Sequence, residues 1–444
     1  MSALTGVVVH NARVAPLLRE RYGARELDVL EALLAGWRVL ELPALANGLY
    51  AAVARPAQGT GCTGYGHTWV RDTVHVAHVA WERGDVGQAS RAARSLLGWF
   101  ALQAPRFEAV IRGEADAQDP LQRPHVRFVG LTLQESPEWW PHAQNDALGY
   151  GLWFLARAAL AGLLPADAAT GTVLLRFPRY LRAIDYVRDR DSGHWEEHRK
   201  VNASSIGTVV AGLVALRGLL RARPELARAD GAALVPGLLD EGRAALAALL
   251  PDESRGNADP RLDRRADAAL IFLLHPLRVV TGDAAEAVLA RVRSDLQGPH
   301  GIRRYVGDSY WCAGYKRLVP ESVRSAGFGD DLGARDALLI PGTEAQWCLF
   351  DPYLSCLHGW RFLATRDPRQ RELQAFHWNR ALGQLTGADC PLGEGLSPEA
   401  WYQPDAAHPE RREPNDDTPL LWVQAGLISA LGALRNTAAF AKDA

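Results

Sequence analysis

Apolar residues recur at helical spacing along most of this 444-residue chain, while the alternation typical of strands is scarce. Two clear examples follow capping signals, one at Asn202 and Ser204 and one at Thr418. The run Ala147–Leu160 is apolar almost all round, which predicts a helix buried on every side. Further helices are predicted near residues 24–35, 70–83, 86–103, 173–188, 234–250, 266–275, 284–296, 344–364 and 368–385.

No Gly/Ser-rich or Pro-rich linker divides these segments, so we expect an all-α fold in a single domain over residues 1–444. Residues 1–23 either belong to this domain or form an N-terminal extension. Periodicity alone would allow a closed barrel or a helical solenoid. Loops as long as the irregular stretches here are usually functional, and we expect them to wall a pocket at one end of the domain. They cover about 104–143, 251–265, 298–342 and 386–418.

The composition gives no support to several kinds of partner. A formal net charge of −2 leaves no basic footprint for nucleic acid or for a membrane surface. The apolar stretch Gly6–Val9 is too short for a signal peptide. The cysteines are odd in number without CxxC spacing, so we expect reduced thiols and a cytoplasmic protein.

The loop Asp191-Ser-Gly-His-Trp-Glu-Glu-His-Arg-Lys200 carries the strongest chemical signal. Trp195 supplies an aromatic face for a pyranose, and Glu196 or Glu197 supplies a carboxyl group that could protonate a glycosidic oxygen. Consecutive side chains point in different directions, so a second catalytic carboxylate must come from elsewhere in the chain. The alternative for this segment alone is a solvated acidic loop.

Five motifs in order resemble those of the family 15 glycoside hydrolases, the glucoamylases. The resemblance is closer still to the glucoamylase-like domain of phosphorylase kinase regulatory subunits. Two segments carry this closer resemblance, Val201–Gly207 and Pro398–Tyr402. That branch is regulatory, so kinship alone does not guarantee activity. The five motifs are Gly64-Tyr-Gly-His-Thr-Trp-Val-Arg-Asp72, Trp140-Pro-His-Ala-Gln-Asn-Asp146, Trp195-Glu-Glu197, Gly301-Ile-Arg-Arg-Tyr305 and Leu396-Ser-Pro-Glu399.

The resemblance implies an (α/α)6 barrel and an inverting hydrolase with Glu196 as general acid and Glu399 as general base. Glu394 is a competing base, but its Gly-Glu-Gly surroundings do not match the family's motif. Glu197 is expected to orient the leaving sugar rather than transfer a proton. The expected substrate-binding residues are Tyr65, Trp69, Arg71, Asp72, Trp140, Gln144, Asp146, Trp195, Glu197, Arg304, Tyr305 and Trp401.

Two features depart from the glucoamylase pattern, and both would affect the leaving-group side. His142 stands where glucoamylases usually carry arginine, and Ala400-Trp401 follows the base glutamate. The other interpretation of Arg71 and Asp72 is a helix-capping aspartate with an ion-paired arginine.

A metal-binding alternative comes from His194-Trp-Glu-Glu-His198, which fits the H-x-x-E-H pattern of inverted zinc peptidases. It would need both histidines on one helical face, and the Ser-Gly turn before them argues against that. His75 and His78 also have ligand-like spacing, but one face of an ordinary helix explains them better. No metal or cofactor is therefore expected.

The expected function is an exo-acting α-glucosidase that releases β-glucose from the non-reducing end of short α-glucans such as isomalto- or malto-oligosaccharides. The alternatives are a catalytically silent glucan-binding or regulatory module, and a trehalase. Linkage preference and oligomeric state are left open by the sequence.

Overall fold

The computed structural model describes residues 4–53, 67–321, 324 and 331–440. Its inner helices form a closed ring in which each packs on the next and the last returns to the first. In order around the ring they are α2 (Val70–Glu82), α5 (Asn145–Leu160), α8 (Ala203–Ala222), α10 (Leu270–Leu274), α14 (Phe350–Thr365) and α16 (Leu421–Phe440).

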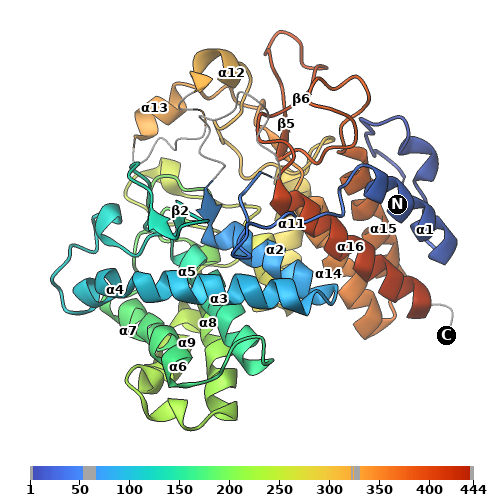
Figure 1. Cartoon of the computed structure of the whole chain (residues 1–444). Helices are drawn as coiled ribbons and strands as arrows, with labels where there is room; N and C mark the ends of the chain where they lie inside the picture. Colours follow the sequence, from blue (N-terminus) through green and yellow to red (C-terminus); the bar gives the residue numbers. More distant parts are fainter. Residues whose placement is uncertain (1–3, 54–66, 322–323, 325–330, 441–444) are drawn as a thin grey trace.

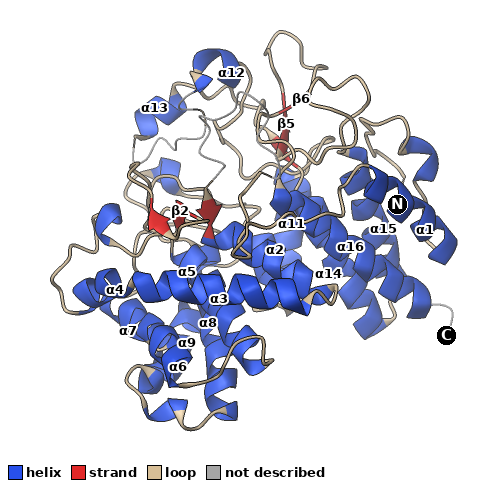
Figure 2. Ribbon diagram, viewed as in Figure 1, coloured by secondary structure: helices blue, strands red, loops and turns tan. Residues whose placement is uncertain are grey.

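A second layer of helices packs outside this ring, which makes the fold an (α/α)6 barrel (Figures 1 and 2). The outer layer consists of α1 (Ala24–Gly36), α3 (Val86–Leu102), α6 (Ala168–Leu174) with α7 (Arg176–Ala183), α9 (Val235–Leu249), α11 (Gly282–Arg291) and α15 (Pro368–Gly383).

Sequence pattern decides which layer a helix joins. Outer helix α1 buries only Leu27, Leu30 and Leu34, one stripe at helical spacing, whereas α5 is buried on all sides, as its apolar pattern predicted. Inner α8 is apolar enough to span a membrane by length and composition, yet 72% of its most apolar 18-residue window is buried inside the protein. It is therefore the core helix of the barrel.

Glycines allow the inner helices α5 and α8 to touch. A Cβ added at Gly149 would lie 2.5 Å from the backbone carbonyl carbon of Thr208, and one at Gly212 would lie 2.8 Å from the carbonyl oxygen of Gly149. Any larger residue at these two positions would push the helices apart.

The four predicted loops each precede an inner helix: α5, α10, α14 or α16. Because the inner helices all run in the same direction, these connections gather at one end of the barrel, in the upper part of Figure 1. Two small antiparallel sheets tie them down. One joins β1 (Thr68–Trp69), β2 (Arg127–Val129) and β3 (Gln134–Glu135), and the other joins β4 (Gln346–Trp347), β5 (Ala400–Tyr402) and β6 (Glu413–Pro414).

Several predicted boundaries were wrong. The helix expected at 173–188 is two helices, α6 and α7, and the one expected at 344–364 begins at Phe350 because Gln346 and Trp347 pair with β5. The helix expected at 266–275 is only α10, which ends before Pro276. The expected loops also contain α4 (Ala104–Ile111), α12 (Tyr315–Leu318) and α13 (Leu332–Asp336). Four cysteines are free thiols, and Cys62 lies outside the described residues.

Candidate active site

The loops before the inner helices enclose a cavity of about 100 Å³ at the end of the barrel where those helices begin. Helix N-termini carry partial positive charge, so this end favours ionised carboxylates. The wall is aromatic as well as charged. Nine predicted site residues line it: Trp69, Arg71, Asp72, Trp140, Trp195, Glu196, Glu197, Arg304 and Glu399.

The acid loop Asp191–Lys200 is a tight turn whose two ends form an antiparallel bridge. The amides of Glu196 and Glu197 donate back to the carbonyls of Gly193 and Ser192, at 3.2 Å each. Glu196 has a φ of 58°, a left-handed conformation that costs a non-glycine residue roughly 1–2 kcal/mol. This backbone turns the two glutamate side chains toward separate partners, as the sequence predicted.

Glu196 lies in an environment suited to a general acid. Its Oε1 accepts a hydrogen bond from Nη2 of Arg71 at 3.1 Å, and its side chain is 15% exposed. Burial raises the pKa of Glu196 more than the positive charges of Arg71 and Arg127 lower it. The carboxyl group therefore retains its proton to a higher pH than an exposed glutamate does.

Arg71 is fixed by a buried network. Its Nη1 donates to Oδ2 of Asp146 at 2.5 Å and to Oε1 of Gln144 at 3.3 Å. Asp146 and Gln144 are buried behind Arg71 and do not line the cavity, so they orient the arginine. Burial raises the pKa of Asp72 to about 7, against the opposing charge of Arg71. Asp72 lines the cavity, and the helix cap of α2 is Trp69 rather than the aspartate of the capping alternative.

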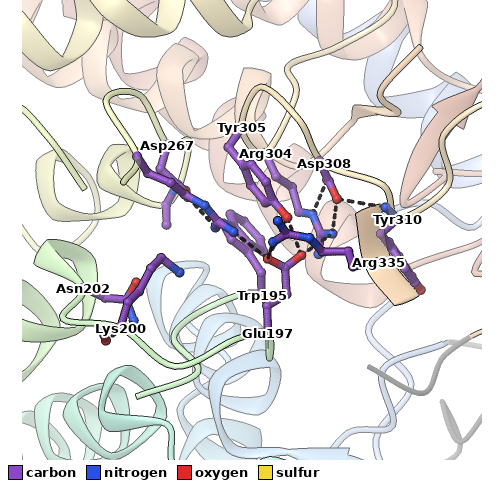
Figure 3. Close-up of polar contacts among 12 residues, drawn as sticks. Trp195, Glu197, Lys200, Asn202, Asp267, Arg304, Tyr305, Asp308, Tyr310 and Arg335 are labelled. Atoms are coloured by element: carbon purple, nitrogen blue, oxygen red, sulfur yellow. Dashed lines mark hydrogen bonds and ion pairs between the residues drawn. The ribbon is translucent and has the colours of Figure 1, made fainter. Parts of the chain in front are cut away.

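Glu197 is held by a ring of donors from the loops before α10 and α14 (Figure 3). The hydroxyl of Tyr305 lies 2.7 and 2.6 Å from its two oxygens, and Nη2 of Arg264 lies 2.7 Å from Oε2. Nη2 of Arg304 donates to Oε1 at 3.1 Å, and Arg335 lies 3.8 Å away. Burial alone would raise the pKa of Glu197, but Arg264, Arg304 and Arg335 together lower it to about 2. Glu197 is thus held as an anion, whereas the pKa of Glu196 is shifted in the opposite direction.

We expect Glu197→Gln to destabilise the fold by about 3–5 kcal/mol at pH 7, because it leaves buried guanidinium groups unpaired. The pKa of Glu197 is depressed in the folded state, so its contribution is complete above its unfolded pKa of 4.5 and decreases as pH falls toward 2. Below pH 4.5 the difference between variant and wild type should shrink by up to about 1.4 kcal/mol per pH unit.

Urea unfolding of both proteins between pH 7 and pH 3 measures this difference. Arg13→Gln, which removes a surface ion pair, is the control with little effect at any pH. A stability difference for Glu197→Gln that does not change with pH would contradict the assigned ionisation.

Glu399 immediately precedes β5 and reaches the same cavity from a different loop. Its Oε2 accepts a hydrogen bond from Nδ2 of Asn415 at 2.5 Å. Burial, followed by the charge of Glu399, raises the pKa of neighbouring Asp417 well above its usual range. Asp417 therefore retains its proton to a higher pH than an exposed aspartate does, and it shares a hydrogen bond with Glu399.

Glu394, the competing base, lies on the surface instead. Its Oε2 pairs with Nη1 of Arg13 at 3.2 Å, and Glu394 does not line the cavity.

Aromatic rings cover much of the cavity wall. Trp69 and Trp140 meet edge to face with ring centroids 5.7 Å apart, and the guanidinium of Arg127 lies 4.1 Å from the Trp140 ring. Trp195 is fixed by a hydrogen bond from its Nε1 to Oδ1 of Asp267 at 2.9 Å. Rings held in this way present rigid apolar faces of the kind that bind the faces of a sugar.

The expectation that Trp401 forms a sugar platform was wrong. Its ring stacks on His10 at 3.6 Å, its Nε1 donates to the carbonyl of Gln384, and it does not line the cavity. These contacts hold the ring against His10 and the end of α15, so it is not free to serve as a sugar platform. Tyr305 also lies behind the wall, where it holds Glu197.

Two other residues singled out in the sequence are not part of the described cavity wall. Tyr65 lies outside the described residues. His142, expected on the leaving-group side, is buried against His125 with ring centroids 3.7 Å apart and does not line the cavity.

The geometry required by the zinc-peptidase alternative is not present. Residues 191–200 form no helix, and His194 is buried, with Nε2 3.2 Å from the hydroxyl of Tyr150. His75 and His78 lie on α2 in the core, where they stack on Trp422 and Trp153. Within the described ranges, no group of three histidine, cysteine or acidic residues is placed to hold a metal ion.

Sequence reasoning missed several residues of the site. Ser309, Tyr310 and Trp347 line the cavity from the segment before α14, and Leu420 and Trp422 line it from the start of α16. Their place at the cavity could have been predicted in part, because each of these residues lies in or beside a loop that precedes an inner helix. The remaining cavity residues that were not predicted are Ala52, His194 and Leu349.

No protein-family model matches this chain. A probable phosphorylase b kinase regulatory subunit alpha from Caenorhabditis elegans is 25% identical over 399 residues, which cover 81% of this chain. The chain spans 30% of the length of that relative.

Solved structures share the fold over nearly the whole chain. A wild-type glycosidase aligns with a TM-score of 0.64 at 22% identity, covering 94% of this chain and 99% of its own. A glucoamylase from Saccharomycopsis fibuligera aligns with a TM-score of 0.58 at 12% identity, covering 98% of each chain. The fold is therefore that of glucoamylases and related glycosidases. At such low identities the likeness establishes the fold, and any activity must be argued from the site.

Proposed function

We propose that this protein is an inverting, exo-acting α-glucosidase that releases β-glucose from the non-reducing end of short α-glucans. One observation carries the proposal: Glu196, whose pKa is raised by burial, and Glu399, which accepts a hydrogen bond from Asn415, reach one cavity from separate loops. Inverting hydrolysis needs this pairing, in which the neutral carboxyl protonates the leaving oxygen and the ionised one activates water.

The other cavity residues suit the recognition of a terminal sugar. Arg71 and Asp72 offer a donor and an acceptor for neighbouring hydroxyl groups, between the rings of Trp69 and Trp140. The cavity volume of about 100 Å³ favours one sugar ring at a time over a long glucan threaded through an open groove. In this mechanism Arg71 also holds the Glu196 carboxyl in place by its 3.1 Å hydrogen bond.

A catalytically silent, glucan-binding regulatory module is the second candidate. The observation in its favour is the similarity to a kinase regulatory subunit. Trehalose remains a substrate to test, because the sequence leaves the linkage preference open.

Incubating the protein with maltose, isomaltose, maltotriose, dextran and trehalose, followed by a glucose assay, tests the proposal. We expect glucose from at least one α-glucan, in the presence or absence of EDTA, and none from a Glu196→Gln/Glu399→Gln double variant. Measurable sugar binding without glucose release would favour the regulatory module. Loss of activity in EDTA that zinc restores would contradict the proposed metal-independent chemistry.

A further inference from the structure

A second cavity, of about 300 Å³, lies toward the opposite end of the barrel. Its wall comes from the second half of α5, the middle of α8, the outer helix α9 and Leu277–Val279, shortly after α10. The inner helices begin at the candidate active site, so these segments lie toward the far end, where α9 is seen low in Figure 1.

Every ionisable residue that lines this second cavity among the described residues is an arginine: Arg157, Arg243 and Arg278. The rest of the wall is apolar and includes Trp153 and Leu277. Three cations in one concave, partly apolar site repel each other unless an anion joins them.

The arginines are held by neutral groups. Arg157 donates to Nε2 of His78 at 3.0 Å, and its guanidinium lies 4.5 Å from the Trp153 ring. Burial lowers the pKa of His78, so the imidazole is neutral and does not compensate the charge. The guanidinium of Arg278 lies 4.6 Å from the ring of Trp360.

The nearest carboxylate does not neutralise them. Glu82 accepts a hydrogen bond from Ser429 at 2.9 Å and lies 3.7 Å from Nδ1 of His78. Within the described chain, neither Arg157, Arg243 nor Arg278 has a carboxylate within ion-pair distance. Burial lowers the pKa of both Arg157 and Arg278, and the negative charge of Glu82 offsets this effect only in part.

We propose that this second cavity binds a small phosphate monoester, with the phosphate among the three arginines and the organic part against Trp153 and Leu277. Planar guanidinium groups match the geometry of phosphate oxygens and form charge-assisted hydrogen bonds with them. The cavity of about 300 Å³ leaves room for both the phosphate and the organic part of such an ester.

Isothermal titration with glucose 6-phosphate, phenyl phosphate, inorganic phosphate and uncharged glucose tests the proposal on the full chain. Glucose 6-phosphate or phenyl phosphate should bind once per chain, more tightly than inorganic phosphate and more weakly as salt rises. Arg157→Gln and Arg278→Gln should each weaken that binding by about 10- to 100-fold.

Two controls separate this site from general effects and from the candidate active site. Arg221→Gln, at an exposed position near the end of α8, should bind the ester as wild type does. Glu399→Gln should also bind it normally, so the result does not depend on the proposed glucosidase activity. If Arg157→Gln or Arg278→Gln fails to fold, Arg243→Gln at an exposed position on α9 replaces it.

Saturable binding of an ester that Arg157→Gln weakens and Arg221→Gln does not would support the proposal. Tighter binding of inorganic phosphate than of either ester would overturn the ester assignment. Absence of saturable binding at millimolar concentrations, or equal binding by wild type and the arginine variants, would overturn the site itself.

Discussion

Glu196→Gln is expected to lower kcat on any α-glucan substrate by about 10²- to 10⁴-fold while leaving the fold intact. The amide keeps the size of the carboxyl group and can still contact Arg71, but it has no proton to give the leaving oxygen. Because the wild-type acid must be protonated, wild-type activity should decrease as pH rises through the elevated pKa of Glu196. The variant's residual activity should lack that alkaline decrease.

Steady-state kinetics with a thermal unfolding curve for each protein measures this effect. Glu399→Gln should show a comparable loss, because it removes the group that activates water. Glu394→Gln is the matched control, since Glu394 forms a surface ion pair with Arg13, and it should retain near wild-type activity. Near wild-type turnover in Glu196→Gln would remove it from the mechanism.

Arg71→Met is expected to destabilise the fold by about 3–5 kcal/mol, as much as Glu197→Gln, and to abolish activity as well. It removes the 2.5 Å partner of Asp146, whose side chain is 0% exposed, and leaves a buried carboxylate without its cation. The same change frees Glu196 from its hydrogen bond, so activity should also be lost even where the variant is folded.

Urea unfolding of Arg71→Met and of the double variant Arg71→Met/Asp146→Asn separates the cost of the orphaned Asp146 charge from the other effects of losing Arg71. Removing the orphaned charge as well should restore part of the stability without restoring activity. Arg13→Met, which breaks an exposed pair, should cost less than about 1 kcal/mol. A cost equally small for Arg71→Met would contradict the role given to the buried network.

Much of the fold could be predicted because inner helices such as α5, α8 and α16 are apolar nearly all round, whereas the outer helix α1 carries a single apolar stripe. The residues at which the helices begin and end could not be predicted. Gln346 and Trp347 look like the start of a helix, and only pairing with Ala400 and Trp401, more than fifty residues later, makes them a strand. The strands themselves are two or three residues long, too short for alternation to be visible.

The candidate site, too, could be predicted only in part. Resemblance placed Glu196, Arg71 and Glu399 at one cavity, but it could not reveal which predicted residues stand behind the wall. Asp146 and Tyr305 act on Arg71 and Glu197 rather than face the cavity. Asn415 and Asp417, which contact Glu399, carry no recognisable signal, because their role depends on how the loop before α16 folds back.

Proton NMR during the first minutes of hydrolysis is the most direct test of the central claim, because it identifies the first anomer before mutarotation mixes the two forms. If Glu399 activates water on the face opposite a leaving group protonated by Glu196, an α-linked substrate must first give β-glucose. Initial β-glucose, released as single units without early intermediate oligosaccharides, is the result that the account predicts. Initial α-glucose would mean a retaining double displacement and would contradict it.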